Sequence, residues 1–179
     1  MDQSIQLGDG GTGITFEANT FYNFKPNFGM YGSFFYLSNP REQNGVRTYR
    51  ETITPVLANE AIMSVPDQFM FRAGVNYSFN QIKGLSLAAG ARYEGIPVKD
   101  LIGGSGDFRR PGYIWSVEPS VNYAFNQVSL FASVPFAVVR NRTQSVTDKE
   151  NTIKRGVFVR GDAAFADYSV NVGMSVKIH

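Results

Sequence analysis

The chain has 179 residues, 43% of them hydrophobic, 14% aromatic and 18% charged, with a formal net charge of +2. It has no cysteine and its one histidine is His179, so disulfides, thiolate metal sites and histidine-based catalytic triads are excluded. The nearly balanced charge argues against the concentrated basic surface that binds nucleic acid. No stretch of about 18 apolar residues could form a transmembrane helix, and the length fits one domain.

Apolar residues alternate with polar or small residues in long runs along the chain. In chain order, the seven runs cover residues 14–24, 28–36, 69–79, 85–94, 113–125, 128–138 and 168–178. Because successive side chains of a strand point to opposite faces, this period of two predicts β-strands. The runs are longer than the ~5–6 residues of a typical soluble strand and match the ~9–11 residues of a strand that spans a membrane.

The apolar face of these runs is ordered along the strand, with aromatic residues near the ends. In run 69–79, for example, Ala73 and Val75 stand between aromatic residues on either side. The predicted girdle residues are Tyr22, Phe24, Phe69, Phe71, Tyr77, Phe79, Trp115, Tyr123 and Phe125. Two aromatic girdles around an aliphatic band are typical of barrels in the outer membrane of Gram-negative bacteria. We therefore predict an all-β fold, an antiparallel transmembrane up-and-down β-barrel.

A soluble β-sandwich or lipocalin-like barrel is the alternative fold, and in it the aromatic face would point inward. Strand length would then vary more, and a buried core would not need its aromatic residues sorted to the strand ends. Run length and aromatic placement therefore favour the membrane barrel.

The connections between the runs alternate between tight turns and long polar loops. The tight turns are 25–27, 80–84 and 126–127, and the long loops are about 38–67, 96–112 and 141–166. In outer-membrane barrels, short turns face the periplasm and long loops face outside. This assignment predicts a periplasmic C-terminus at His179.

Seven runs are an odd number, whereas bacterial single-chain barrels have even strand numbers with both ends in the periplasm. The first run also enters from the extracellular side under this assignment. We therefore expect residues 1–179 to be a single barrel domain that is the C-terminal portion of a larger, even-stranded barrel. Earlier strands, and a signal peptide, would precede it.

Residues 2–13 read DQSIQLGDGGTG and lead directly into the first run. This stretch resembles a segment of the outer-membrane family labelled "MetA-pathway of phenol degradation", with Leu7 where proline is expected. Members of that family look like transporter-type barrels. The resemblance implies a channel for small molecules, with hydrophobic or aromatic compounds as candidates.

The face opposite the girdles is small and polar, and it carries a few charges. The predicted lumen charges are Glu17, Arg72, Arg92, Glu94 and Glu118. One interpretation is a network of salt bridges that fills the barrel, since charges in a narrow interior need partners. The other is a constriction that selects solutes by charge.

Large apolar side chains share that inward register, which is unexpected in a purely aqueous channel. They are Phe21, Tyr31, Phe35, Met70 and Phe131. They either pack inside the barrel or against a plug, or they form an amphipathic path along which aromatic solutes slide.

Two function classes follow from this pattern. The favoured one is an outer-membrane channel for passive uptake of small, hydrophobic or aromatic molecules. The alternative is a small structural or adhesive barrel whose extracellular loops bind partners. An enzyme is not expected, because Glu94 and Asp100 are the best remaining carboxylates and neither has an evident nucleophile beside it.

The expected partners are the lipid bilayer of the outer membrane and a small-molecule solute. The sequence predicts no nucleic-acid partner, no cofactor and no metal site, and it leaves the oligomeric state open.

Overall fold

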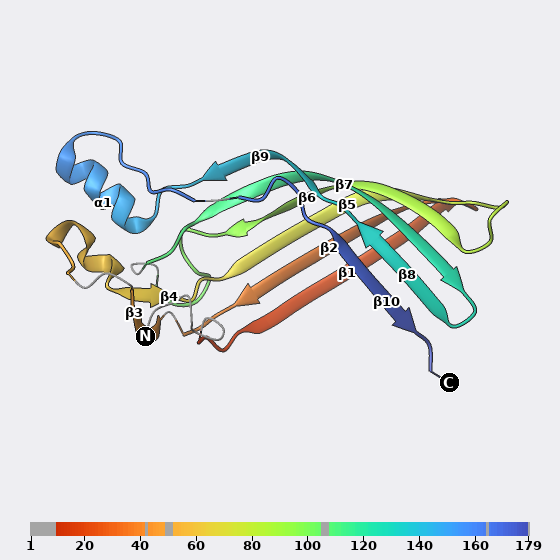
Figure 1. Ribbon diagram of the computed structural model, residues 1–179, viewed down its shortest axis with the longest axis horizontal. Coiled ribbons are helices and arrows are strands. Elements are labelled where there is room, and N and C mark those ends of the chain that lie inside the picture. The colour runs from red at the N-terminus through yellow and green to blue at the C-terminus, as the bar shows by residue number, and fades with distance from the viewer. Residues whose placement is uncertain (1–9, 42, 49–51, 105–107, 164, 179) are drawn as a thin grey trace.

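The computed structural model describes residues 10–41, 43–48, 52–104, 108–163 and 165–178. Most of these residues form one antiparallel sheet that curls like half a barrel (Figure 1). Its strands are β1 (Ile14–Lys25), β2 (Phe28–Ser38), β5 (Gln68–Ser78), β6 (Leu85–Ile96), β7 (Gly112–Phe125), β8 (Val128–Ser133), β9 (Phe136–Arg142) and β10 (Asn171–Val176). They neighbour one another in the order β1-β2-β5-β6-β7-β8-β10, and β9 also pairs with β7.

Each of the seven predicted runs contributes a strand to this sheet, so the prediction of a mostly antiparallel β-sheet fold is confirmed. The prediction of one continuous strand over 128–138 is wrong, because this run is divided into β8 and β9. Pro135 lies at the break and has no N–H for the sheet, while the Val134 N–H donates to the Pro119 carbonyl at 3.1 Å. The last run is shorter than expected, with Tyr168 joined to Phe136 only by an isolated bridge.

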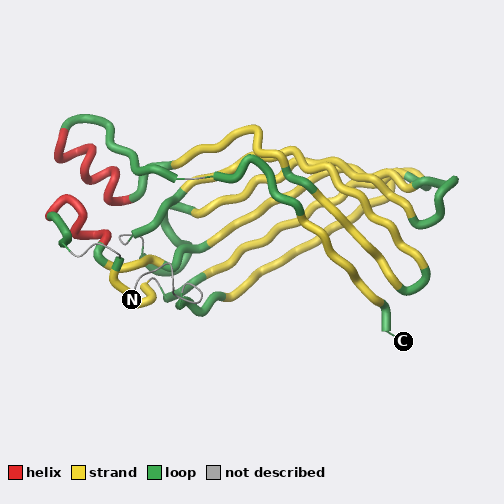
Figure 2. The backbone as a smooth tube through the Cα atoms, viewed as in Figure 1, coloured by secondary structure: helices red, strands yellow, loops and turns green. Residues whose placement is uncertain are grey.

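Tight turns lie at one end of the sheet and long connections at the other (Figure 2). Two tight turns use left-handed backbone, at Gly84 with φ +87° and at Asn126 with φ 50°. A Cβ at Gly84 would also lie 1.9 Å from the Ala124 carbonyl oxygen, so only glycine fits that turn. Strand β10 runs toward this tight-turn end (Figure 1).

The long loops contain secondary structure that the period-two pattern does not predict. The first holds a two-stranded sheet of β3 (Gln43–Arg47) and β4 (Ile62–Ser64) with the 3₁₀ helix η2 (Pro55–Glu60) between them, and the third holds helix α1 (Val146–Arg155). Neither helix in the described part of the chain is long and apolar enough to cross a membrane.

Helix α1 forms because its ends are capped. The Asp148 N–H donates to the Ser145 Oγ at 3.1 Å, and the Ser145 N–H donates to the Asp148 carboxylate at 2.9 Å. The helix ends at Gly156, whose φ of 68° suits glycine. The long connection 141–166 therefore contains a helix that the period-two pattern does not predict, and the spacing of Ser145 and Asp148 is the signal that could have located it.

The sheet is not covered by a second layer of buried apolar side chains. Among the described residues, Val65 is the single hydrophobic residue in the buried class, and it lies between β4 and β5 rather than under the sheet. Directly paired residues of an antiparallel sheet share a face, so the register assigns each strand residue to one of two faces. One face is polar and the other is apolar.

Candidate functional site

The polar face is the concave side of the curled sheet, and we call it the inner face. One row across it pairs Asn19 with Ser33, Ser33 with Arg72, Arg72 with Arg92, and Arg92 with Ser116. A cavity of about 680 Å³ opens on this face, and its lining includes Asn19 of β1 and Asn171 of β10. Because these two strands are the edges of the sheet, the cavity lies within the curl.

The best-defined contact on the inner face is the ion pair between Arg72 of β5 and Glu118 of β7. The arginine Nε donates to Oε2 at 2.9 Å and Nη2 donates to Oε1 at 2.8 Å. The Glu118 side chain is 2% exposed and that of Arg72 is 30% exposed. The arginine reaches across β6 to make this bond, and the β6 residue paired with Glu118 is Gly90.

Tyr31 occupies the space that two glycines leave beside this ion pair. A Cβ at Gly74 would lie 2.7 Å from the tyrosine Cζ, and a Cβ at Gly90 would lie 2.4 Å from its Oη. The ring therefore extends from β2 over β5 and reaches β6. The sequence places Tyr31 on this face but gives no sign that it covers a pair of glycines.

Arg92 and Glu94 of β6 form a second ion pair, in which Arg92 Nη2 donates to a Glu94 carboxylate oxygen. The Arg92 Nε is buried and has no hydrogen-bond partner among the described residues. Arg72 and Arg92 face each other across β5 and β6, an arrangement that is unfavourable unless acids compensate it. Glu118 and Glu94 supply this compensation.

The structure brings four of the five predicted lumen charges together and leaves one apart. Glu17 lies on the edge strand β1, opposite Phe35, and accepts a hydrogen bond from Asn19 Nδ2 at 2.8 Å in an exposed position. The other four form what we call the charge cluster, which consists of Arg72, Arg92, Glu94 and Glu118.

The register places all five predicted apolar residues on the inner face, at three levels along the strands. Phe35 pairs with Met70 near the long loops, Phe21 pairs with Tyr31 at mid-height, and Phe131 lies toward the tight turns, opposite Asn122. Phe21 is 57% exposed and Phe131 is 48% exposed. Both rings therefore offer apolar surface to the concave space.

The apolar face of the sheet, which we call the outer face, carries aromatic rings in two bands. Near the long loops, ring centroids of Tyr93 and Trp115 lie 4.6 Å apart, and those of Phe34 and Phe71 lie 5.0 Å apart. Near the tight turns, close ring pairs are Phe24–Phe28 at 5.0 Å, Tyr77–Phe79 at 5.1 Å and Tyr123–Phe125 at 5.9 Å. Of the predicted girdle residues, Tyr22 lies one level inward of the second band, opposite Met30.

Between the two bands, the outer face is built from small and aliphatic residues. Ala73 pairs with Ala91 and Ala91 pairs with Val117 at mid-height. Val117 is 50% exposed and Val75 is 43% exposed. This middle zone is apolar and uncovered.

Sequence reasoning missed a buried polar cluster at the base of the long loops. Arg109 forms two parallel hydrogen bonds to Asp100, at 2.7 and 2.8 Å, and both side chains are 0% exposed. Asp67 accepts from the Tyr36 hydroxyl at 2.6 Å and from the backbone of Asn39 and Leu101. This cluster joins loops 38–67 and 96–112 to β2, and no local pattern marks its residues because they lie in separate loops.

The two carboxylates considered for catalysis are already engaged. Glu94 pairs with Arg92, and Asp100 is enclosed by Arg109. The part of the chain that the structure describes contains no group of three or more His, Cys, Asp or Glu side chains that could hold a metal ion.

Comparison with protein-family models, with curated proteins and with solved structures gave no match. The resemblance to the phenol-degradation family rests on residues 2–13, of which residues 2–9 lie outside the described residues, as does His179.

Proposed function

We propose that this chain forms part of an outer-membrane β-barrel through which small molecules, including hydrophobic or aromatic ones, pass by passive diffusion. One observation carries the proposal: the apolar face of a curled sheet is exposed over its whole width, with Phe16 54% exposed on β1 and Val172 76% exposed on β10. Soluble monomers rarely expose contiguous apolar surface of this extent. Lipid would cover it, and the two aromatic bands would lie at the headgroups.

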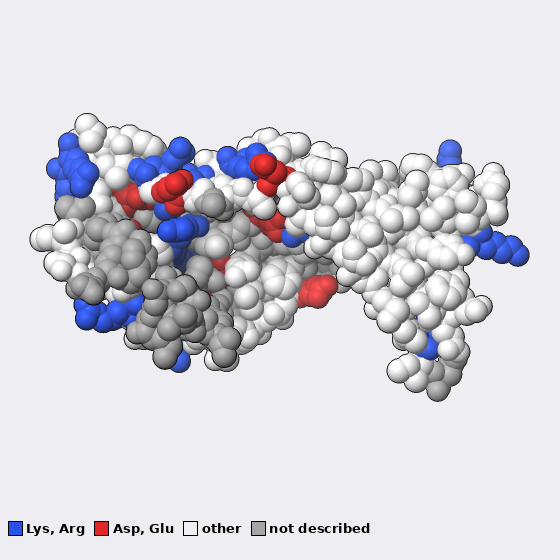
Figure 3. Space-filling view, in the orientation of Figure 1, with Lys and Arg blue, Asp and Glu red and all other residues white. Residues whose placement is uncertain are grey.

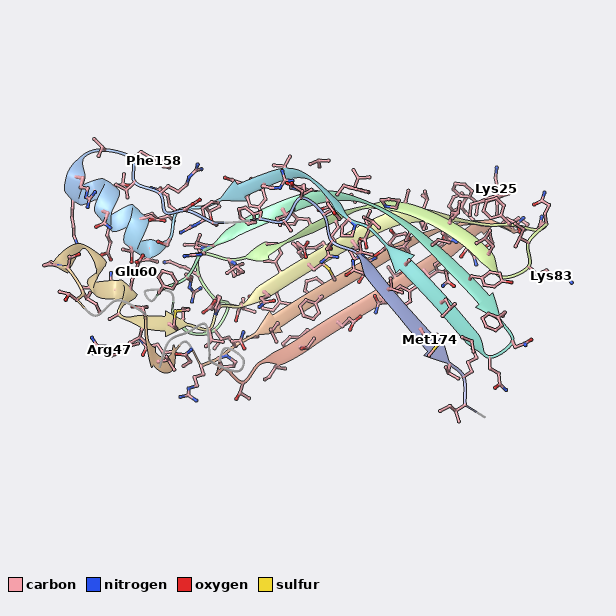
Figure 4. The ribbon with its side chains drawn as sticks, in the orientation of Figure 1. Lys25, Arg47, Glu60, Lys83, Phe158 and Met174 are labelled. Atoms are coloured by element: carbon pink, nitrogen blue, oxygen red, sulfur yellow. The ribbon has the colours of Figure 1, made fainter. Side chains whose placement is uncertain are left out.

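The distribution of charge supports an orientation with the long loops outside. Charged side chains gather mainly at the end that carries α1 and the long loops (Figure 3). Lys25 and Lys83 lie at the opposite tip, beyond the aromatic band of the tight turns (Figure 4). In this orientation the tight turns, and the end of the chain after β10, face the periplasm.

The two edges of the sheet must be paired in lipid. Strands β1 and β10 each have a neighbour on one side only, among the described residues. An unpaired strand edge in the hydrocarbon region leaves N–H and C=O groups without partners, at a cost of several kcal/mol per group. We therefore propose that further strands pair with β1 and β10 and close an even-stranded barrel whose lumen is the inner face.

Within that lumen, the charge cluster serves mainly as structure. Each arginine has an acidic partner, and the Glu118 side chain is almost fully buried, so the cluster presents little free charge to a solute. Phe21 and Phe131 instead expose apolar rings to the same space. A lumen of this composition favours amphipathic and aromatic solutes over purely hydrophilic ones.

The order of the long loops favours the second candidate function, a structural or adhesive barrel. Arg109, buried with Asp100, also donates to Ser64 Oγ of the first long loop at 2.7 Å. Asn59 of η2 donates to the carboxylate of Glu150 of α1 at 2.9 Å. Rigid loops of this kind could present a surface to a partner.

Conductance of the full protein in a planar bilayer, together with solute flux into vesicles, separates the two candidates. A channel gives stepwise conductance and flux of small aromatic solutes. Closed vesicles and the absence of conductance, with the barrel folded, would contradict the channel and support the structural barrel.

A further inference from the structure

A second cavity, of about 570 Å³, lies at the long-loop end of the inner face, and we call it the mouth pocket. Its lining includes the apolar residues Phe35, Met70, Ile114 and Phe165 and the two arginines Arg92 and Arg110. The volume falls within the ~300–1,000 Å³ of typical small-molecule sites.

One wall of the mouth pocket is a single row of the sheet. Phe35 pairs with Met70, Met70 with Glu94, and Glu94 with Ile114, so these four side chains lie side by side on the inner face. Three of the four are apolar. A methionine sulfur beside a phenylalanine ring can contact a flat aromatic ligand favourably, because thioether sulfurs and aromatic rings attract one another.

Phe165, from the segment after α1, also lines the pocket. A Cβ at Gly112 would lie 2.9 Å from the Phe165 Cζ, so the ring lies directly against the backbone of β7. Phe165 is partly buried there. Two phenylalanines from distant parts of the sequence therefore contribute to the apolar lining of the pocket.

The pocket carries an excess of positive charge. Among the described residues that line it, the charged ones are Arg92, Arg110 and Glu94, and Glu94 is paired with Arg92. The buried Arg92 Nε has no partner among the described residues. Arg110 is exposed, lies 5.5 Å from the Phe108 ring, and forms no ion pair within the described part of the chain.

We infer that the mouth pocket binds small aromatic carboxylates. The ring lies between the row of Phe35 and Met70 and the ring of Phe165, and the carboxylate accepts hydrogen bonds from the guanidinium of Arg110. Arginine suits this role because its planar fork matches the geometry of a carboxylate. The inference deepens the proposed function, since it makes the pocket the capture site at the entrance of the channel.

Benzoate is the probe, and the methionine methyl groups of the full protein in micelles are the reporters. The sequence has five methionines. Met70 lines the pocket, whereas Met30 and Met174 are exposed on the outer face. In spectra of methyl-labelled protein, benzoate should shift the Met70 signal saturably, through the ring current, and leave those of Met30 and Met174 in place.

Two comparisons isolate the carboxylate contact. Benzyl alcohol, which has the ring without the negative charge, should bind about tenfold more weakly than benzoate. Arg110→Gln should weaken benzoate binding by a similar factor and leave benzyl alcohol unchanged, whereas Arg155→Gln at the end of α1 should change neither. Arg110 is exposed, so its substitution should not disturb folding.

Three results would overturn the inference: no Met70 shift at millimolar benzoate, equal affinity for benzoate and benzyl alcohol, or no effect of Arg110→Gln. Because the assay measures binding in micelles, its outcome is independent of conductance. Absent conductance with the Met70 shift intact would reject the channel and keep the pocket.

Discussion

Arg72 and Glu118, 46 positions apart in the sequence, form a two-pronged ion pair that spans the intervening strand β6. Beside the pair, the Tyr31 hydroxyl lies over Gly90, the β6 residue that pairs with Glu118, 2.4 Å from where a Cβ would stand. The ion pair fixes β5 relative to β7 on the inner face and neutralises a carboxylate that has almost no exposure.

Arg72→Ala should destabilise the folded protein by about 3–5 kcal/mol, because it leaves the buried carboxylate of Glu118 without its partner. The double substitution Arg72→Met with Glu118→Leu should cost much less, since it removes both charges and keeps apolar volume. Urea unfolding in micelles measures the free energy of unfolding of the single and the double variant. Equal losses for the single and double variants would show that Glu118 does not depend on Arg72.

Val117→Lys should prevent efficient insertion into lipid vesicles, at a cost of about 2–4 kcal/mol, because it puts a charge in the middle of the outer face. Leu101→Lys is the matched control, since Leu101 is 74% exposed in a long loop. Heat-modified mobility on gels reports the folded, inserted fraction. If Val117→Lys inserts as well as the control, the outer face does not contact hydrocarbon.

Trp115 offers a direct measure of depth, because it is the one tryptophan in the sequence. It is 43% exposed on the outer face and stacks on Tyr93 in the band near the long loops. Its emission should shift to the blue on insertion into vesicles. Lipids brominated near the headgroup should quench it more than lipids brominated near the chain ends, because tryptophan prefers the interface. Quenching that is strongest from the chain ends, or absent, would contradict the girdle assignment.

Phe21→Ala and Phe131→Ala should each slow the uptake of small aromatic solutes and leave the uptake of sugars unchanged. Both rings are about half exposed to the concave space, where they can stack with a passing aromatic ring. Phe136→Ala is the control, because Phe136 is 49% exposed on the other face, opposite Val117. Flux assays in vesicles, run with an aromatic solute and a sugar for each variant, measure the two uptake rates. Equal slowing of aromatic and sugar solutes would mean that these rings shape the pore without selecting its cargo.

Local sequence pattern located the long strands of the main sheet, their two faces and the tight turns, but not the small sheet of β3 and β4 or the division between β8 and β9. Alternation of side chains is a property of each strand by itself, so residues such as Tyr77 and Asn76 are assigned to opposite faces without knowledge of their neighbours. Helix α1 was also within reach, because Ser145, Asp148 and Gly156 mark its ends locally. Alternation of period two indicates strands only, so it does not reveal this helix.

Only the tertiary structure decided which residues meet. The register of β5, β6 and β7 brings Arg72 to Glu118. Glu17, which follows the same alternation, lies on the edge strand and accepts a hydrogen bond from its neighbour Asn19. The Arg109–Asp100 pair and the approach of Phe165 to Gly112 depend on how the long loops fold back, which no periodicity encodes. The sequence by itself thus determined the two chemically different faces, because side-chain alternation is local. The contacts on them required the pairing of strands distant along the chain, which is set by the packing of the whole sheet.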